Sequence, residues 1–203
     1  MKLIIGNKRF SSWSLRPWLL LTHFEIPFEE IKITLDTPTF KTDIAQYSPS
    51  GKVPALIDGE LNLWESLAIA EYLNDKHPQK KMWPADIKER ALARAVSAEM
   101  ASGFATMRSH MPHDLKKELK DFDSSKADAD ITRVQEIWRT CLERSKGPFL
   151  FGQFSIADAM FAPVVNRFVS YGVKVTDTLC RDYVQTIRNL PAHRRWIEQG
   201  LIE

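Results

Sequence analysis

Residues 53–63, VPALIDGELNL, decide the fold of the first part of the chain. Residues 53–57 and 61–63 are short apolar runs of the kind that form strands. Asp58 and Gly59 separate the two runs, and an Asp-Gly pair in this position is a strong signal for a tight hairpin. The segment therefore predicts two antiparallel strands.

Strand and helix patterns alternate on both sides of this hairpin. Apolar alternation indicates a strand, whereas apolar residues at three- and four-residue steps indicate a helix. The expected elements are strands at 3–6 and 28–35 and helices at 15–22, 39–47 and 65–76. The resulting order, β-α-β-α-β-β-α, predicts a small mixed sheet covered by helices over residues 1–77.

Strand signals almost vanish in the rest of the chain. Residues 78–86 contain two prolines and no periodicity, so we interpret them as a linker. Apart from a polar loop at 120–130, helices are expected over 87–111 and 131–142 and near 155–170, 177–189 and 191–199. The predicted fold class is α/β plus all-α, with an all-helical domain over 87–203.

Composition excludes several classes of function. The 203 residues include 28 basic and 26 acidic side chains, and a net charge of +2 gives no field that would gather nucleic acid or an anionic membrane. No apolar stretch approaches the roughly 20 residues that a membrane span requires. The two cysteines form no CxxC pair, and with the five histidines they form no metal-ligand spacing. We expect a cytoplasmic protein without a metal site.

Residues 10–18, FSSWSLRPW, contain the first candidate for chemistry. Pro17 indicates a helix start near residues 14–16, which leaves Ser11 and Ser12 beside the unpaired N–H groups of a helix N-terminus. Such a place favours an anion, and a thiolate held there would have a lowered pKa. The segment has no cysteine, so the sulfur would come from a bound molecule. The alternative is a serine helix cap without a ligand.

Two further segments suit the recognition of a peptide. An expected strand begins at Lys52, Val53 and Pro54. A cis bond before Pro54 would turn the Val53 backbone outward to pair with an extended peptide. The sequence leaves the isomer of this bond open. Glu65 and Ser66 open a helix, where a carboxylate and a hydroxyl suit a free amino-acid head. The alternatives are an ordinary strand entry and simple capping.

Taken together, in this order and spacing, these segments resemble the glutathione transferase superfamily over essentially the whole chain. The resemblance includes Ser11 with Arg16, the K-V-P of residues 52–54 and the E-S of residues 65–66. It also includes SIAD at residues 155–158, a predicted capping box that marks the fold of this family.

The resemblance implies a thioredoxin-like domain that binds glutathione, a helical domain that forms the electrophile site, and a homodimer. By position, Ser11 is the hydroxyl expected to stabilise the glutathione thiolate, with Ser12 and Ser14 as reserves. Lys52 would face the glycyl carboxylate, and Val53, next to Pro54, would pair its backbone with the cysteinyl part. Glu65 and Ser66 would hold the γ-glutamyl head.

The expected activity is transfer of the glutathione sulfur to a small, largely hydrophobic electrophile. SSWS at residues 11–14 is similar to the S-S-C-S motif of the zeta class, some members of which isomerise maleylacetoacetate. Trp13 replaces the cysteine of that motif, which argues against isomerase activity. The candidates for the electrophile pocket are Phe10, Trp13, Met100, Phe104, Met107 and Arg108. A methionine and aromatic stripe is also typical of plain core, and a non-catalytic interaction protein of the same fold is a further alternative.

Overall fold

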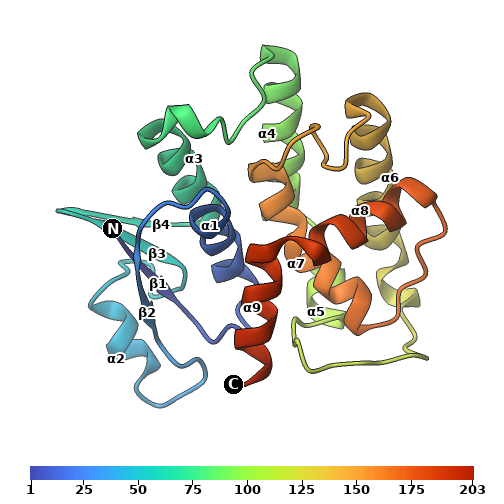
Figure 1. The fold of residues 1–203 in the computed structure, drawn as a ribbon. Coiled ribbons are helices and arrows are strands. Elements are labelled where there is room, and N and C mark those ends of the chain that lie inside the picture. Colours follow the sequence, from blue (N-terminus) through green and yellow to red (C-terminus); the bar gives the residue numbers. More distant parts are fainter.

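A computed structural model describes all residues from 1 to 203 and has the predicted order of elements in its first part (Figure 1). The elements of this part are β1 (Lys2–Ile5), α1 (Ser12–His23), β2 (Glu29–Lys32), α2 (Phe40–Ala45), β3 (Ala55–Asp58), β4 (Leu61–Trp64) and α3 (Ser66–Lys76). The expected β-α-β-α-β-β-α pattern is therefore confirmed.

The four strands form one mixed sheet in the order β2-β1-β3-β4. β1 is parallel to β2, while β3 is antiparallel to both β1 and β4. The predicted hairpin is present, with Asp58 paired to Leu61 and with Gly59 at a positive φ of 61°. Glycine suits this position because it has no Cβ to clash.

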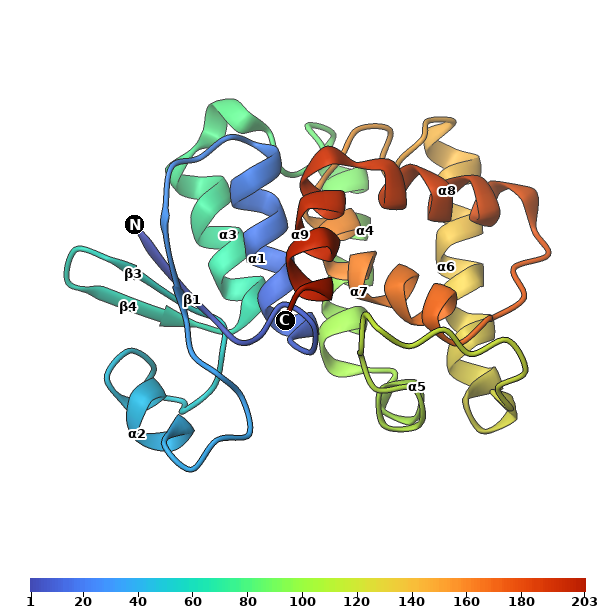
Figure 2. The ribbon, with the colours of Figure 1, turned by 60° about the horizontal axis from the view of Figure 1, so that its bottom comes forward.

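Both faces of the sheet are covered, which explains why β1 is apolar at successive positions. Leu3 and Ile5 point into the main core with α1 and α3. Ile4 points the other way and packs with Ile44 of α2 in a small second cluster. Figure 2 shows α2 on the side of the sheet opposite α1 and α3.

The remainder of the chain is helical. It contains the short 3₁₀ turns η1 (Pro78–Lys80) and η2 (Ser125–Ala127) and the helices α4 (Ile87–Ser102), α5 (Ala105–His110), α6 (Asp128–Ser145), α7 (Ile156–Ser170), α8 (Thr178–Asn189) and α9 (Pro191–Leu201). This confirms the predicted fold class. None of these helices combines the length and the apolar character that crossing a membrane demands.

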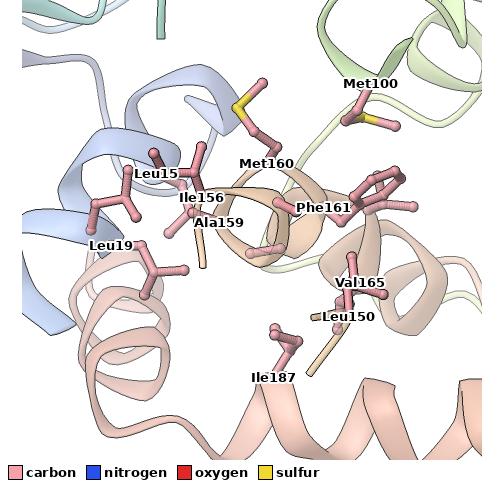
Figure 3. Close-up of a cluster of buried hydrophobic side chains, with 14 of the residues drawn as sticks. Leu15, Leu19, Met100, Leu150, Ile156, Ala159, Met160, Phe161, Val165 and Ile187 are labelled. Carbon is pink, nitrogen blue, oxygen red and sulfur yellow. The ribbon is translucent and has the colours of Figure 1, made fainter. Parts of the chain in front are cut away.

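Helix α7 is the centre of the helical part, and 14 of its 15 residues are buried. Its N-terminus has the predicted capping box, in which the fully buried Asp158 accepts hydrogen bonds from the N–H and the hydroxyl of Ser155. Leu15 and Leu19 of α1 lie beside this end of α7 (Figure 3). A single hydrophobic core of 46 buried residues thus runs through both parts of the chain.

The single helix expected over 87–111 is wrong. Gly103 is extended and Phe104 has a positive φ of 61°, so α4 ends before them and α5 begins after them. The Asp130 carboxylate accepts a hydrogen bond from the backbone N–H of Met107 at 2.8 Å. A carboxylate of α6 therefore stabilises the separate start of α5.

The loop expected over residues 120–130 is also shorter than predicted. It is interrupted by η2, and α6 begins at Asp128. Asp128 and Asp130 lie in the first turn of α6, where negative charge is favourable beside the positive end of the helix dipole. Asp128 and Asp130 contributed to the polar composition that predicted a loop, but in the structure they belong to a helix N-terminus.

Candidate active site

A cavity of about 230 Å³ lies between the sheet-containing part and α4. Its lining residues are Trp13, Ser50, Lys52, Val53, Pro54, Glu65, Ser66 and Ala101. They come from the start of α1, the loop before β3, the start of α3 and the end of α4. The five residues that the sequence suggested for peptide recognition therefore meet in one cavity.

A larger hollow of about 790 Å³ lies beside η1 and the first turns of α4, away from all of these residues. Two of its arginines are paired within the protein, Arg94 with Glu71 and Arg144 with Glu89. The smaller cavity is the better candidate for chemistry, because it brings together the residues that the sequence suggested for peptide recognition.

The backbone at Val53 is available to a ligand. The Val53–Pro54 bond is cis, β3 begins only at Ala55, and Val53 makes no backbone hydrogen bond. The exposed Lys52 beside it has no ion-pair partner. Free N–H and C=O groups at a strand end suit pairing with an extended peptide, and a free ammonium suits a carboxylate.

The start of α3 offers a second set of polar groups. Glu65 precedes the helix with a positive φ of 67°, and its side chain makes no capping bond. Ser66, only 2% exposed, is the first residue of the helix, where the backbone N–H groups have no intrahelical partner. A non-glycine residue held at positive φ costs free energy, and such residues cluster at functional sites.

The serines around Trp13 are buried and do not line the cavity. Helix α1 begins at Ser12, earlier than the expected start near 14–16, because Ser11 acts as its N-cap. The Ser11 hydroxyl accepts from the Ser14 N–H at 3.3 Å and donates to the Ser14 hydroxyl at 2.7 Å. Ser14 is fully buried and accepts from the N–H of Gly6 at 3.1 Å. The predicted donor thus faces Ser14 in the structure.

Ser12 points toward the helical part of the chain. Its hydroxyl lies 3.4 Å from Nη2 of Arg167, a residue of α7. Two carbonyls hold the same guanidinium, that of Met111 at 2.9 Å and that of Pro163 at 3.2 Å. Burial, with repulsion from Arg108 as the next cause, lowers the pKa of Arg167 to about 10.

Trp13 stacks on two more arginines. The guanidinium carbon of Arg16 lies 3.9 Å from the ring centroid, and that of Arg108 lies 5.0 Å from it. Burial lowers the pKa of Arg16 well below its usual value, and repulsion from Arg108 and Arg167 adds to this effect. None of the three arginines has an acidic partner. We call Arg16, Arg108 and Arg167 the arginine cluster.

The other candidates for the electrophile pocket lie elsewhere. Met100, Phe104 and Met107 belong to the hydrophobic core, and Phe10 is 43% exposed on the loop before α1. Of the six candidates, only Trp13 lines the cavity, and Arg108 adjoins it through Trp13.

Sequence reasoning missed Ser50, Ala101 and Arg167. Arg167 had a usable signal, because an arginine in a run as apolar as residues 156–170 must be paired or functional. Ser50 and Ala101 had none, since both are small residues that only tertiary packing brings to the cavity.

Comparison with known proteins identifies related chains for both parts. Residues 10–76 match the family model of the glutathione S-transferase N-terminal domain, and residues 90–199 match that of the C-terminal domain. The glutathione S-transferase Z2 of Arabidopsis thaliana is 28% identical over 200 residues, which are 93% of this chain and 87% of that protein. The maleylacetoacetate isomerase of Rattus norvegicus is 30% identical over 157 residues, 76% of this chain and 71% of that protein.

A solved structure is similar over the whole length. It is a glutathione transferase homologue from Burkholderia with bound glutathione, with a TM-score of 0.76 and 25% identity. The match covers 100% of this chain and 98% of that one.

Proposed function

This chain belongs to the glutathione S-transferase family, and on that premise we propose that its cavity holds glutathione while the bound thiolate attacks a small, largely hydrophobic electrophile. The chain is an enzyme, and glutathione is its co-substrate. The observation that carries the assignment of the site is the convergence of Lys52, Val53, Pro54, Glu65 and Ser66 on one cavity.

Each of these residues suits one part of the tripeptide. Lys52 pairs with the glycyl carboxylate, because its ammonium is exposed and free. The unpaired backbone of Val53 bonds to the cysteinyl residue. Glu65 accepts from the γ-glutamyl ammonium, and Ser66 with the N–H groups of α3 donates to the γ-glutamyl carboxylate.

Ser11 is the proposed donor to the thiolate. Its own proton is directed to the Ser14 hydroxyl in the structure. The two hydroxyls can exchange roles, since the Ser14 oxygen keeps its bond from Gly6 while its proton turns to Ser11. The Ser11 proton is then free for the sulfur, and a donor at a helix N-terminus lowers the pKa of a thiol.

Replacement of Ser11 by alanine tests this role. We expect Ser11→Ala to raise the pKa of the bound thiol by about one unit, which corresponds to about 1.4 kcal/mol. The measurement is an ultraviolet titration of the thiolate in the enzyme–glutathione complex, alongside calorimetry of glutathione binding, which should change little.

Ser12→Ala is the matched control, because it removes a neighbouring hydroxyl that faces Arg167 instead. A thiol pKa that shifts in Ser12→Ala and not in Ser11→Ala would transfer the role to Ser12. Absence of glutathione binding at millimolar concentration would favour a non-catalytic interaction protein and would overturn the proposed function.

A zeta-like isomerase of the maleylacetoacetate type is the second candidate. The arginine cluster favours it, because three buried or half-buried cations without acidic partners suit an anionic substrate. The rat relative carries the name of this activity. Isomerisation regenerates glutathione and conjugation consumes it, so the amount of free thiol after turnover distinguishes the two reactions.

We also propose a homodimeric, cytoplasmic enzyme of detoxification. Leu61 and Trp64, on the edge strand β4, are 40% and 39% exposed, and burial of such apolar residues favours pairing of two chains. Sedimentation velocity tests the dimer.

Both cysteines are free and buried, which suits a reducing compartment. Burial raises the pKa of Cys180 to about 12, so this thiol is protonated and unreactive.

A further inference from the structure

Trp13 lines the cavity and also contacts two members of the arginine cluster. Its ring lines the cavity with Lys52 and Glu65. The same ring lies over the guanidinium groups of Arg16, at 3.9 Å, and of Arg108, at 5.0 Å. A molecule held next to the proposed glutathione site therefore meets the indole before it meets these two cations.

The cations are fixed in place by backbone carbonyls rather than by acids. Arg16 donates to the carbonyl of Met160 at 3.1 Å, and Arg108 donates to that of Met100 at 2.6 Å. Nη1 of Arg16 is buried without any partner. A buried cation without a counter-ion is unfavourable, and the negative face of the Trp13 indole compensates part of this cost. The charge of Asp130 acts on Arg108 in the same direction, because it raises the pKa of that guanidinium against the effect of burial.

We propose that Trp13 sets the charge class of the electrophile by covering the faces of Arg16 and Arg108. The indole stabilises both guanidinium groups in the absence of a ligand, and a carboxylate has to displace it in order to pair with them. A neutral aromatic electrophile needs no such displacement, because it carries no charge that has to reach the guanidinium groups. This inference rests on the proposed function, and it names neutral aromatic compounds as the preferred substrates.

A pair of probes that differ in charge can measure this preference. The probes are 4-chloro-3,5-dinitrobenzoate and its methyl ester. In the reaction the thiolate sulfur forms a bond to the ring carbon, the carbon–chlorine bond breaks, chloride leaves with the electron pair, and the thiol proton passes to solvent. The intrinsic reactivities of the two probes cancel when the kcat/KM ratio of a variant is compared with that of the parent chain.

Trp13→Ala should raise the ratio of kcat/KM for the carboxylate over the ester about tenfold, the effect expected for the loss of a cation–π cover. Trp13→Phe keeps an aromatic face over both arginines and should retain most of the parent preference. Adding Arg108→Gln to Trp13→Ala removes one exposed cation and should abolish most of the gain. Thermal unfolding of each variant checks that it is folded.

Binding without chemistry separates this inference from the proposed function. 3,5-Dinitrobenzoate has no leaving group, and calorimetry should show about tenfold tighter binding to Trp13→Ala than to the parent chain. This result is expected even if neither chlorinated probe is conjugated, an outcome that would count against the proposed function alone. Equal affinity of Trp13→Ala and the parent chain for 3,5-dinitrobenzoate would overturn the role of Trp13. The same holds if Trp13→Phe binds this carboxylate as tightly as Trp13→Ala does.

Discussion

Two histidines of the helical part are held as neutral rings. Burial, with repulsion from Arg167 as the next cause, lowers the pKa of His113 to about 3. Burial, with repulsion from Arg188, lowers the pKa of His193 to about 4. The His113 ring lies 3.2 Å from the amide nitrogen of Asn166, whereas neither ring nitrogen of His193 has a partner. Protonating either ring in the folded protein places an unpaired charge in the core.

These two residues predict loss of stability in mild acid. The folded protein binds fewer protons than the unfolded chain below pH 6.5, so each histidine contributes stability that is full above pH 6.5 and falls as the pH drops toward its folded value. Each histidine should lower the free energy of unfolding by at most about 1.4 kcal/mol for every pH unit of acidification in this range. Asp158 acts in the opposite direction, because burial raises its pKa to about 6 and its contribution is lost as the pH rises through that value. We expect a net fall in the free energy of unfolding from pH 6.5 to 4.

Urea unfolding between pH 4 and 8 measures this slope. His193→Gln should flatten it by about 1.4 kcal/mol per pH unit at most. Equal slopes for His193→Gln and the parent chain would show that another group titrates.

Whether the sequence alone could identify a site residue depends on which contacts place that residue in the site. Lys52, Val53 and Glu65 contribute charge or backbone at the ends of elements, and the sequence locates such ends well. The Ser11 hydroxyl donates to the Ser14 hydroxyl, whose oxygen also accepts from the backbone N–H of Gly6. This arrangement depends on how the end of β1 packs against α1, which the sequence does not show. Arg167 reaches Ser12 across 155 positions of the chain, and no local pattern reports such a distance.

Among the elements, the break between α4 and α5 shows where periodicity fails. Apolar residues keep helical spacing through Gly103, which is why one helix was predicted. A Cβ on Gly103 would lie 2.9 Å from the carbonyl oxygen of Glu99, so the backbone at this point suits glycine alone. The hairpin of β3 and β4 was predicted correctly because an Asp-Gly pair marks its turn locally, whereas the helix break depends on Asp130 from another element. The strand expected over 28–35 is shorter than predicted, since β2 contains only Glu29–Lys32.

Asp130 should therefore be worth about 1 kcal/mol to the start of α5. Asp130→Ala leaves the Met107 N–H without its acceptor and is expected to lower the free energy of unfolding by that amount in urea titrations. Asp130→Asn retains a side-chain oxygen and should lose clearly less. A loss as large in the asparagine variant as in the alanine variant would mean that charge, rather than the hydrogen bond, stabilises this helix start.

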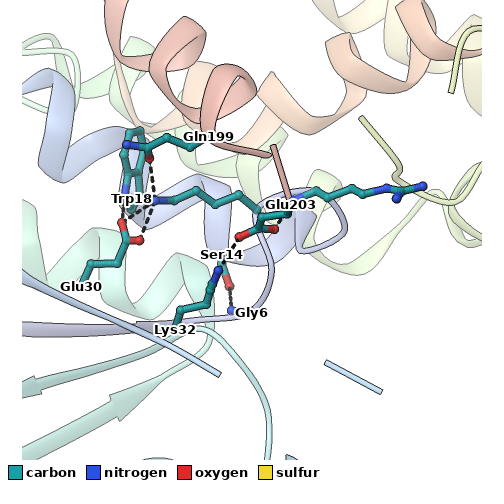
Figure 4. A network of polar contacts seen from close by, with 9 residues as sticks. Gly6, Ser14, Trp18, Glu30, Lys32, Gln199 and Glu203 are labelled. Atoms are coloured by element: carbon teal, nitrogen blue, oxygen red, sulfur yellow. Dashed lines mark hydrogen bonds and ion pairs between the residues drawn. The ribbon is translucent and has the colours of Figure 1, made fainter. Parts of the chain in front are cut away.

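At the scale of the whole molecule, the last helix is joined to the sheet by a buried lysine. The ammonium of Lys8 lies 2.6 Å and 2.7 Å from the two carboxylate oxygens of Glu30 and 2.7 Å from the amide oxygen of Gln199. It also lies over the rings of Trp18 and Trp196, at 5.1 Å and 5.5 Å. Figure 4 shows Glu30, Trp18 and Gln199 converging from β2, α1 and α9. The two parts of the chain are thus coupled by one desolvated charge as well as by the shared core.

Lys8→Met should lower the free energy of unfolding by about 2 kcal/mol, because it removes the charge-assisted hydrogen bonds of the buried ammonium to Glu30 and Gln199. Lys32→Met is the matched control: it removes another lysine–glutamate pair, Lys32 with Glu203, between β2 and the C-terminal end of the chain. That lysine is 45% exposed, so its loss should cost less than about 1 kcal/mol. Combining Lys8→Met with Glu30→Gln should recover part of the stability, since no unpaired charge remains. Urea unfolding followed by tryptophan fluorescence measures the parent chain, the two lysine variants and the double variant. Equal losses of stability in the two lysine variants would show that Lys8 contributes no more than an exposed ion pair.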